Sequence, residues 1–170
     1  MCHHRKGIHM KHYMFILLTL IILGCQKENP VSIEQELLPD VPHVVVTNSN
    51  YVESDIQIRF PDTTYKNKCS ALYKFNLTDS VKRFVASVLL RKAQLLNHDI
   101  SIVSGCLTAT GQLKDSVMSV IYFAERAKYQ SKDCWIFEFA WGLSKDDVGH
   151  HRCFVMDITS KDTLLFITCR

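Results

Sequence analysis

The stretch CWIFEFAW, from Cys134 to Trp141, decides the fold that this sequence predicts. Large apolar side chains recur at every second position, which is the period of a β-strand. They would share one face of a sheet: Trp135, Phe137, Phe139 and Trp141. The segments RCFVMDI (152–158) and TLLFITC (163–169) predict two more strands, joined by a polar turn at 159–162. The end of the chain is therefore predicted to be an antiparallel meander.

The preceding segment, 115–129, is compatible with two structures. Four apolar residues have helical spacing: Val117, Val120, Ile121 and Ala124. The segment is also rich in valine, isoleucine, tyrosine and phenylalanine, which are enriched in strands. We predict a strand here, which would add one more strand to the meander.

An amphipathic helix is predicted upstream, over residues 78–97. Thr78 or Asp79 can cap its first turn, and Asn97 tolerates the left-handed conformation that often ends a helix. Apolar residues recur at three- and four-residue spacing and would form one face: Val81, Phe84, Val85, Val88, Leu89, Leu95 and Leu96.

Two short strands are predicted before this helix, at 43–47 (HVVVT) and at 55–60 (DIQIRF), where apolar and polar residues alternate. One helix and a run of strands predict an α+β fold, with the amphipathic helix packed on one face of a curved antiparallel sheet. We expect residues 43–170 to form this single domain.

The N-terminus resembles a bacterial lipoprotein signal. The apolar run 13–23 would form a helix of about 16 Å, which is too short for a hydrocarbon core of about 30 Å. Basic residues precede the run, as in export signals, and Met10 is a better start than Met1. The run ends in Ile22-Leu23-Gly24-Cys25, which resembles the lipobox, whose cysteine is acylated and becomes the mature N-terminus. We expect residues 1–24 to be a signal peptide; the alternative is an uncleaved apolar helix with an accidental cysteine.

Lipidation of Cys25 would anchor the protein to a lipid bilayer, with residues 25–42 as a polar tether. The resemblance implies the outer membrane of a bacterium, with the domain on the periplasmic or the cell-surface face. The chain has 20 basic and 17 acidic residues, and residues 1–24 contain three basic and no acidic ones. The mature chain is then neutral, which argues against a nucleic-acid partner, because phosphate binding needs clustered positive charge.

The segment WIFEF…VGHHRCFVMDITSKDTLLFI resembles the closing hairpins of NTF2-fold immunity proteins. Six residues occupy matching places: Trp135, Ile136, Glu138, Gly149, Lys161 and Asp162. The chain departs from that pattern at His150 and Thr163, where the family has glycine. The segment also resembles the end of prodomain-like inhibitors of streptopain-type proteases, with Phe154-Val155 in place and Cys153 where that pattern has glycine.

Both resemblances imply a cystatin- or NTF2-like sheet in a small, non-catalytic protein that binds and silences an enzyme. Such a protein presents loops and exposed aromatic residues to its partner. Phe139 and Trp141 near a strand end are candidate anchors; the alternative is that they fill the core.

The segment DDVGHHRC, from Asp146 to Cys153, holds several groups capable of chemistry. Two histidines, with Asp146, Asp147 or Cys153, have the side chains that bind zinc. His150 and His151 are adjacent, however, and would point to opposite faces of a strand. A nucleophilic cysteine would need a histidine brought to it by the fold. We therefore expect a solvated loop that can contact a partner, with no metal, cofactor or catalytic residue.

Five cysteines follow Cys25, and an oxidising compartment would favour disulfides. If residues 160–162 form a three-residue loop, Thr159 faces Thr163, and the same register places Cys153 opposite Cys169. Directly opposed residues are close enough for a disulfide. We predict this bond on the condition that the turn has three residues.

Three functions remain open. The first is a lipid-anchored inhibitor or immunity protein that binds a cognate enzyme. The second is a structural or ligand-binding lipoprotein of a cell-envelope assembly. The third is an enzyme, which would require a deep polar pocket around His150, His151 and Cys153.

Overall fold

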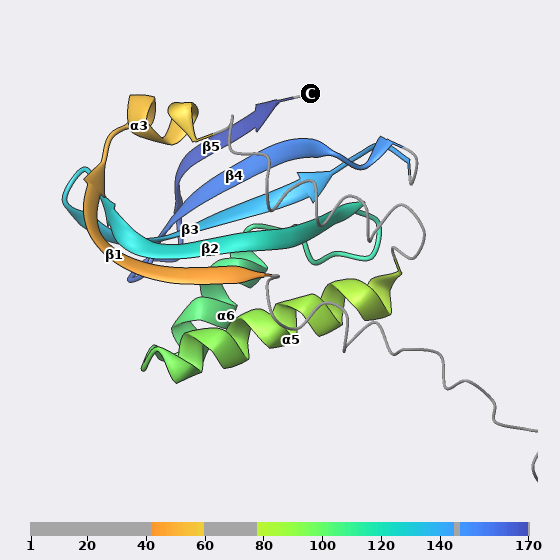
Figure 1. Cartoon of the computed structure of the whole chain (residues 1–170), viewed down its shortest axis with the longest axis horizontal. Coiled ribbons are helices and arrows are strands. Elements are labelled where there is room, and N and C mark those ends of the chain that lie inside the picture. Colours follow the sequence, from red (N-terminus) through yellow and green to blue (C-terminus); the bar gives the residue numbers. More distant parts are fainter. Residues whose placement is uncertain (1–41, 60–77, 145–146, 170) are drawn as a thin grey trace, which may run out of the picture. The chain divides into compact units, whose positions relative to one another are not determined.

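The computed structural model describes residues 42–59, 78–144 and 147–169. The predicted signal peptide, Cys25 and nearly all of the tether lie outside these residues. The described elements are β1 (His43–Tyr51), α3 (Glu53–Ile58), α5 (Asp79–Leu95), α6 (Ile100–Ala109), β2 (Ser119–Tyr129), β3 (Lys132–Trp141), β4 (His150–Asp157) and β5 (Thr163–Cys169) (Figure 1). They form the α+β domain that the sequence predicts. No helix in these ranges is both long and apolar enough to span a bilayer.

The five strands form one sheet in the order β1-β2-β3-β4-β5. Strands β2 to β5 are an antiparallel meander, and the ambiguous segment 115–129 contains a strand, as predicted. The prediction of an entirely antiparallel sheet is wrong, because β1 pairs with β2 in parallel. The helices between β1 and β2 return the chain to the same end of the sheet, so that both strands run the same way.

The strand predicted at 55–60 is also wrong, because the segment Glu53–Ile58 is the short helix α3. The carboxylate of Asp55 accepts a hydrogen bond from the backbone N–H of Val52 at 2.8 Å, which closes the first turn. Glu53 and Asp55 also place negative charge at the positive end of the helix dipole. Only Ile56 of this helix is buried, so the alternating apolar residues do not mark a sheet face.

Helix α5 matches the prediction at both ends. The hydroxyl of Thr78 accepts a hydrogen bond from the N–H of Val81 at 3.3 Å, and Asn97 adopts a φ of 63° just beyond the helix. The prediction of a single amphipathic helix is wrong, because α6 follows at once. Asp99 caps α6 by accepting from the N–H of Ser101 at 2.8 Å.

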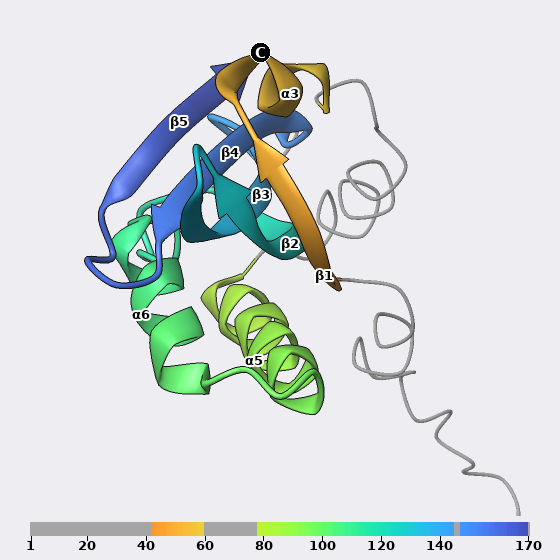
Figure 2. The ribbon, with the colours of Figure 1, turned by 90° about the vertical axis from the view of Figure 1, so that its left-hand side faces the viewer.

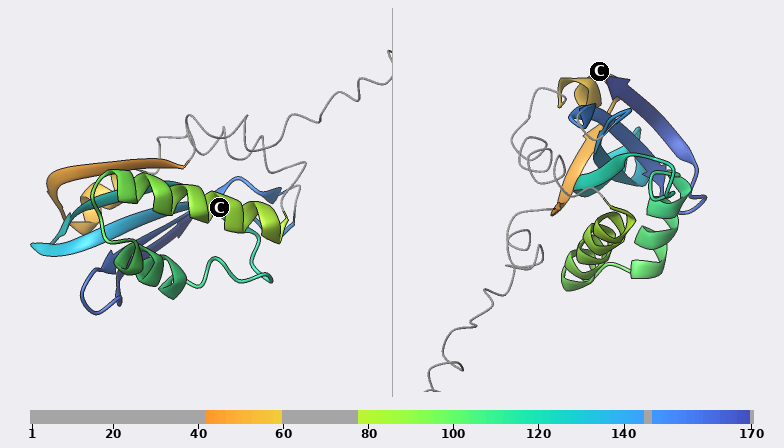
Figure 3. Two further views of the ribbon diagram at one scale, coloured as in Figure 1. Left: turned by 90° about the horizontal axis from the view of Figure 1, so that it is seen from below. Right: turned by 90° about the vertical axis from the view of Figure 1, so that its right-hand side faces the viewer.

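Helices α5 and α6 cover one face of the sheet, and α3 lies on the other (Figures 2 and 3). The main core joins the two long helices to the aromatic face of β3. Its members include Val85, Leu89, Val103, Leu107, Trp135, Phe137 and Phe139. A smaller apolar cluster lies on the opposite face and includes Ile56, Ala127, Ile136, Cys153 and Val155.

The β4–β5 hairpin has a different register from the predicted one. Cys153 pairs with Ile167 and Cys169 pairs with His151, so the two cysteines are not opposed. The carboxylate of Asp157 accepts from two backbone N–H groups within the turn, and a register irregularity follows Val155. This turn is longer than three residues, and the thiol of Cys153 is free and buried.

Candidate functional site

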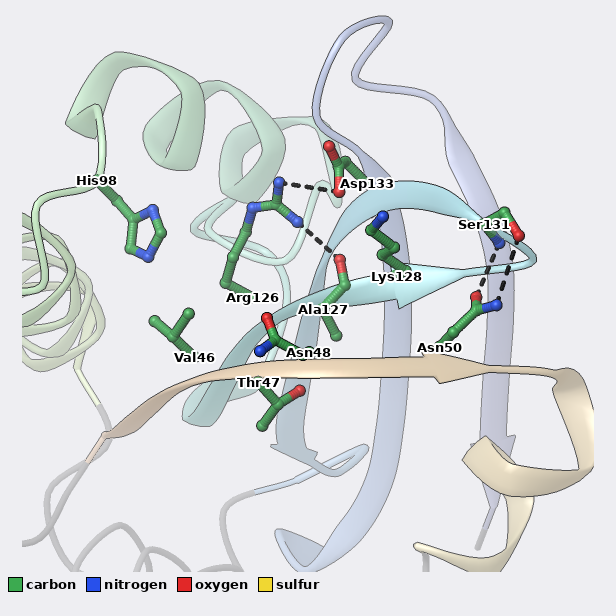
Figure 4. Close-up of a pocket in the computed structure, with 10 residues that line it drawn as sticks. All are labelled: Val46, Thr47, Asn48, Asn50, His98, Arg126, Ala127, Lys128, Ser131 and Asp133. Atoms are coloured by element: carbon green, nitrogen blue, oxygen red, sulfur yellow. Dashed lines mark hydrogen bonds and ion pairs between the residues drawn. The ribbon is translucent and has the colours of Figure 1, made fainter.

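A pocket of about 590 Å³ opens where β1, the β2–β3 hairpin and the α5–α6 turn meet (Figure 4). Most of its lining side chains are polar. They are Val46, Thr47, Asn48, Asn50, His98, Arg126, Ala127, Lys128, Ser131 and Asp133. Parallel pairing of β1 with β2 brings these distant segments together.

Arg126 is held rigidly in this pocket. Its Nη1 donates to the carbonyl of Ala127 at 2.7 Å and to that of Cys134 at 3.3 Å. Its Nη2 lies 3.3 Å from Asp133 Oδ1 (Figure 4). Three acceptors fix the plane of the guanidinium, which limits the entropy lost when a ligand binds it.

His98 forms the wall across from Arg126. Its ring packs edge-on against Trp135, with centroids 5.2 Å apart. Its Nε2 is buried and has no hydrogen-bond partner in the described part of the chain. Burial and the positive charge of Arg126 lower the pKa of His98, so the neutral ring is favoured.

The rim of the pocket is set by the β2–β3 turn. Gln130 and Ser131 both have positive φ values, 48° and 68°, as in the primed turns of two-residue hairpins. Asn50 holds this turn to β1, because its Oδ1 accepts from the Ser131 N–H at 2.8 Å. The β1–β2 register shifts between Val46 and Asn50, and exposed Asn48 lies in that irregular stretch.

The turn that carries His98 also exposes apolar side chains. Leu95 is 76% exposed, and Leu96 and Ile100 are 42% and 43% exposed. We call these three residues the α5–α6 corner. Val46, in the pocket lining, is also exposed. Clustered apolar side chains beside fixed polar groups are typical of protein interaction sites.

A buried ionic cluster lies on the opposite face of the sheet. Arg59 Nη1 is 2.6 Å from Glu125 Oε2, and Arg59 Nη2 is 3.2 Å from Glu138 Oε1. Glu125 also accepts hydrogen bonds from the hydroxyls of Thr47 and Tyr51, at 2.6 and 2.9 Å. Burying an unpaired carboxylate costs free energy, and these contacts offset that cost for Glu125 and Glu138.

Tyr122 extends this cluster toward β4. Its hydroxyl donates to Glu138 at 3.0 Å and lies 2.8 Å from His151 Nε2. Nε2 of His151 is also 3.5 Å from the same carboxylate. Tyr122, Glu138 and His151 are all buried, so this network supports the fold.

The predicted aromatic anchors belong to the interior. Phe139 is fully buried in the main core, and Trp141 is 5% exposed. The indole N–H of Trp141 donates to the carbonyl of His151 at 3.2 Å, and Arg152 stacks on its ring. The prediction that Phe139 and Trp141 contact a partner is therefore wrong, because neither presents a surface.

The two histidines of the predicted DDVGHHRC site lie on opposite faces of β4. His150 Nε2 is 3.0 Å from Asp147 Oδ1, whereas His151 points to the other face and is buried. Asp146 lies outside the described residues. The described residues contain no group of three His, Cys, Asp or Glu side chains that could hold a metal ion.

The described thiols are poorly suited to nucleophilic chemistry. Burial raises the pKa of Cys134 to about 12, and it also raises the pKa values of Cys106 and Cys153. The thiolate is the reactive form, so a raised pKa makes a cysteine inert. Cys153 also pairs across the strands with Glu138, whose charge opposes ionisation.

Sequence reasoning did not identify the pocket residues Arg126 and His98. The pocket around them depends on the parallel β1–β2 pairing, which adds residues of β1 to the lining, and on the α5–α6 turn; neither was predicted. The buried cluster did leave a signal at one position, because Glu138 interrupts the apolar run of β3.

Comparison with known proteins yields no relative: no protein-family model, curated protein or solved structure matches this chain.

Proposed function

We propose that this chain is a lipid-anchored envelope protein that acts by binding, and that its partner is an enzyme whose activity it blocks. The lipobox-like segment ending at Cys25 supports export and anchoring, at the periplasmic or the cell-surface face of an outer membrane. The choice of an enzyme as partner is supported by the resemblance of residues 135–167 to immunity proteins and protease inhibitors.

The observation that carries the proposal is the pocket beside the α5–α6 corner. The corner offers apolar contact area, and Arg126 and His98 offer fixed polar groups within the pocket. Binding hot spots commonly combine apolar contacts with an arginine in a desolvated pocket. This surface replaces Phe139 and Trp141 as the expected contact region.

The architecture is compatible with a binding role. We keep a cystatin- or NTF2-like arrangement as a proposal, supported by helices packed on one face of a curved sheet (Figure 2). The parallel β1–β2 pair departs from that expectation. The buried thiols with raised pKa values favour binding over nucleophilic chemistry at Cys153.

A second candidate is a ligand-binding lipoprotein of an envelope assembly. The pocket volume of about 590 Å³ favours it. Sites for small molecules usually measure about 300–1,000 Å³. This candidate predicts a small ligand that co-purifies with the protein and occupies the pocket.

The test is capture with the full chain, followed by an activity assay of the captured enzyme. We expect the wild type to inhibit the enzyme and Leu95→Asp to inhibit it at least about tenfold less well, because a charge would be placed against an apolar contact. Leu143→Asp is the matched control. Leu143 is similarly exposed and comes two residues after β3, and Figure 1 shows that the end of β3 lies away from the α5–α6 turn. A captured enzyme that keeps full activity, or equal inhibition by both variants, would refute the proposal.

A further inference from the structure

The charge of the pocket by the α5–α6 corner is not balanced among its described lining residues. Arg126 and Lys128 are two residues apart on β2, so both project to the same face. Asp133 is the only acidic residue among the described residues of the lining, and Figure 4 shows it paired with Arg126. The lining therefore carries two positive charges and one negative charge.

The pocket contains several hydrogen-bond donors. A guanidinium has five N–H donors, and the three acceptors around Arg126 use only part of them. Lys128 and Asn48 are exposed and add an ammonium and an amide. Nε2 of His98 is a buried polar atom without a partner in the described part of the chain. These groups suit a ligand that accepts several hydrogen bonds.

We infer that this pocket receives a carboxylate, and that the carboxylate is an acidic side chain of the protein partner. A monoanion matches the single uncompensated positive charge, and a planar carboxylate matches the fork of a fixed guanidinium. The pocket holds more than a carboxylate, which leaves room for adjoining peptide. The α5–α6 corner then contacts apolar residues beside the acidic one. The inference rests on the proposed function and specifies what the partner presents.

His98 provides a direct readout. Burial and, after it, the charge of Arg126 hold the pKa of His98 below the ordinary value, so a carboxylate bound nearby should raise that pKa. Histidine-selective ¹⁵N labelling of the full chain in detergent micelles would follow this ring, with the signal assigned by its loss in His98→Gln. The probes are acetyl-Ala-Glu-Ala-amide and its neutral isostere acetyl-Ala-Gln-Ala-amide.

We expect the glutamate peptide to shift the His98 signals and raise its pKa, and the glutamine peptide to do neither. Lys128→Gln should weaken glutamate-peptide binding about fivefold, the effect of removing one charge at close range in water. Lys132→Gln is the control, because Lys132 is exposed on the same hairpin but outside the pocket lining. Equal shifts with the glutamine peptide, or equal losses for both lysine variants, would overturn the inference.

Two further outcomes separate this inference from the proposed function. If glutarate, a free small dicarboxylate, binds more tightly than the glutamate peptide, the assignment to a protein side chain is wrong. Suppose that an enzyme is captured and inhibited, that the Lys128→Gln variant inhibits it as strongly as the wild type does, and that the glutamate peptide does not shift the His98 signals. The carboxylate site is then wrong, and the proposed function stands. If the glutamate peptide binds as expected but no captured enzyme is inhibited, the site stands and the function fails.

Discussion

Arg59 and Glu125 form a close ion pair, with 2.6 Å between Nη1 and Oε2, and it joins the residue after α3 to the middle of β2. Glu125 is almost fully buried, and Arg59 also contacts Glu138 on β3. Burial disfavours the charged guanidinium, but the two carboxylates outweigh that effect and raise the pKa of Arg59. One cation therefore holds α3 against two strands.

We predict that Arg59→Ala lowers the free energy of unfolding by about 3 kcal/mol, because it leaves two buried carboxylates without their cation. Urea unfolding followed by tryptophan fluorescence measures the change. Arg83→Ala is the matched control, since the Arg83–Asp115 pair is exposed and should cost less than about 0.5 kcal/mol. Equal losses in the two variants would show that the buried cluster adds no special stability.

The lowered pKa of His98 predicts a stability change with pH. The unfolded chain binds a proton at His98 near the ordinary value of 6.5, whereas the folded chain binds it only at lower pH. The folded state therefore loses stability as the pH falls below 6.5, until the folded pKa is passed. His98→Gln should lose less stability than wild type between pH 7.5 and 5, as measured by urea unfolding at each pH. Parallel losses in both proteins would contradict the lowered pKa.

The described thiols should resist alkylation in the native state. Cys106, Cys134 and Cys153 are buried and have raised pKa values, so iodoacetamide at pH 8 should leave them unlabelled until urea is added. Peptide mass mapping measures this under non-reducing conditions. The same map should contain no peptide linking Cys153 to Cys169, because the β4–β5 register does not oppose them. A linked peptide, or rapid native labelling of Cys153, would contradict the structure.

Lipidation at Cys25 stays a prediction from the sequence. An alkyne analogue of palmitate should label the wild type, and Cys25→Ser should remain unprocessed and unlabelled, because acylation needs the sulfur. Cys106→Ser is a suitable control, since that cysteine is buried within the fold. Equal labelling of the Cys25→Ser variant would exclude the lipoprotein assignment.

Local patterns predicted the elements that have a clear apolar pattern in the sequence. Strand β3 has aromatic residues at every second position, β4 and β5 are short apolar runs bounded by polar residues, and α5 has a capping threonine and an apolar stripe. The strand ambiguity at 115–129 was resolved correctly by residue type, because β2 is buried on both faces. In these elements, local preference and tertiary burial agree.

Other features depend on contacts that local patterns do not contain. Helix α6 has ten residues and only three buried ones, Val103, Cys106 and Leu107, so its apolar stripe is short; the first turn of α3 depends on one carboxylate. The parallel pairing of β1 depends on the crossover through α5 and α6, and the pocket depends on that pairing. The cross-strand partner of Cys153 depends on the length of the β4–β5 turn, which the sequence alone does not determine.

The parallel pairing of β1 with β2 also sets an order of events during folding. Each hairpin of the β2–β5 meander joins neighbouring segments and can close early, whereas β1 must wait for the whole crossover to be in place. We expect β1 to join the sheet late, although it leaves the ribosome first. Because residues of both β1 and β2 line the pocket, the chain would complete this pocket only at the end of folding.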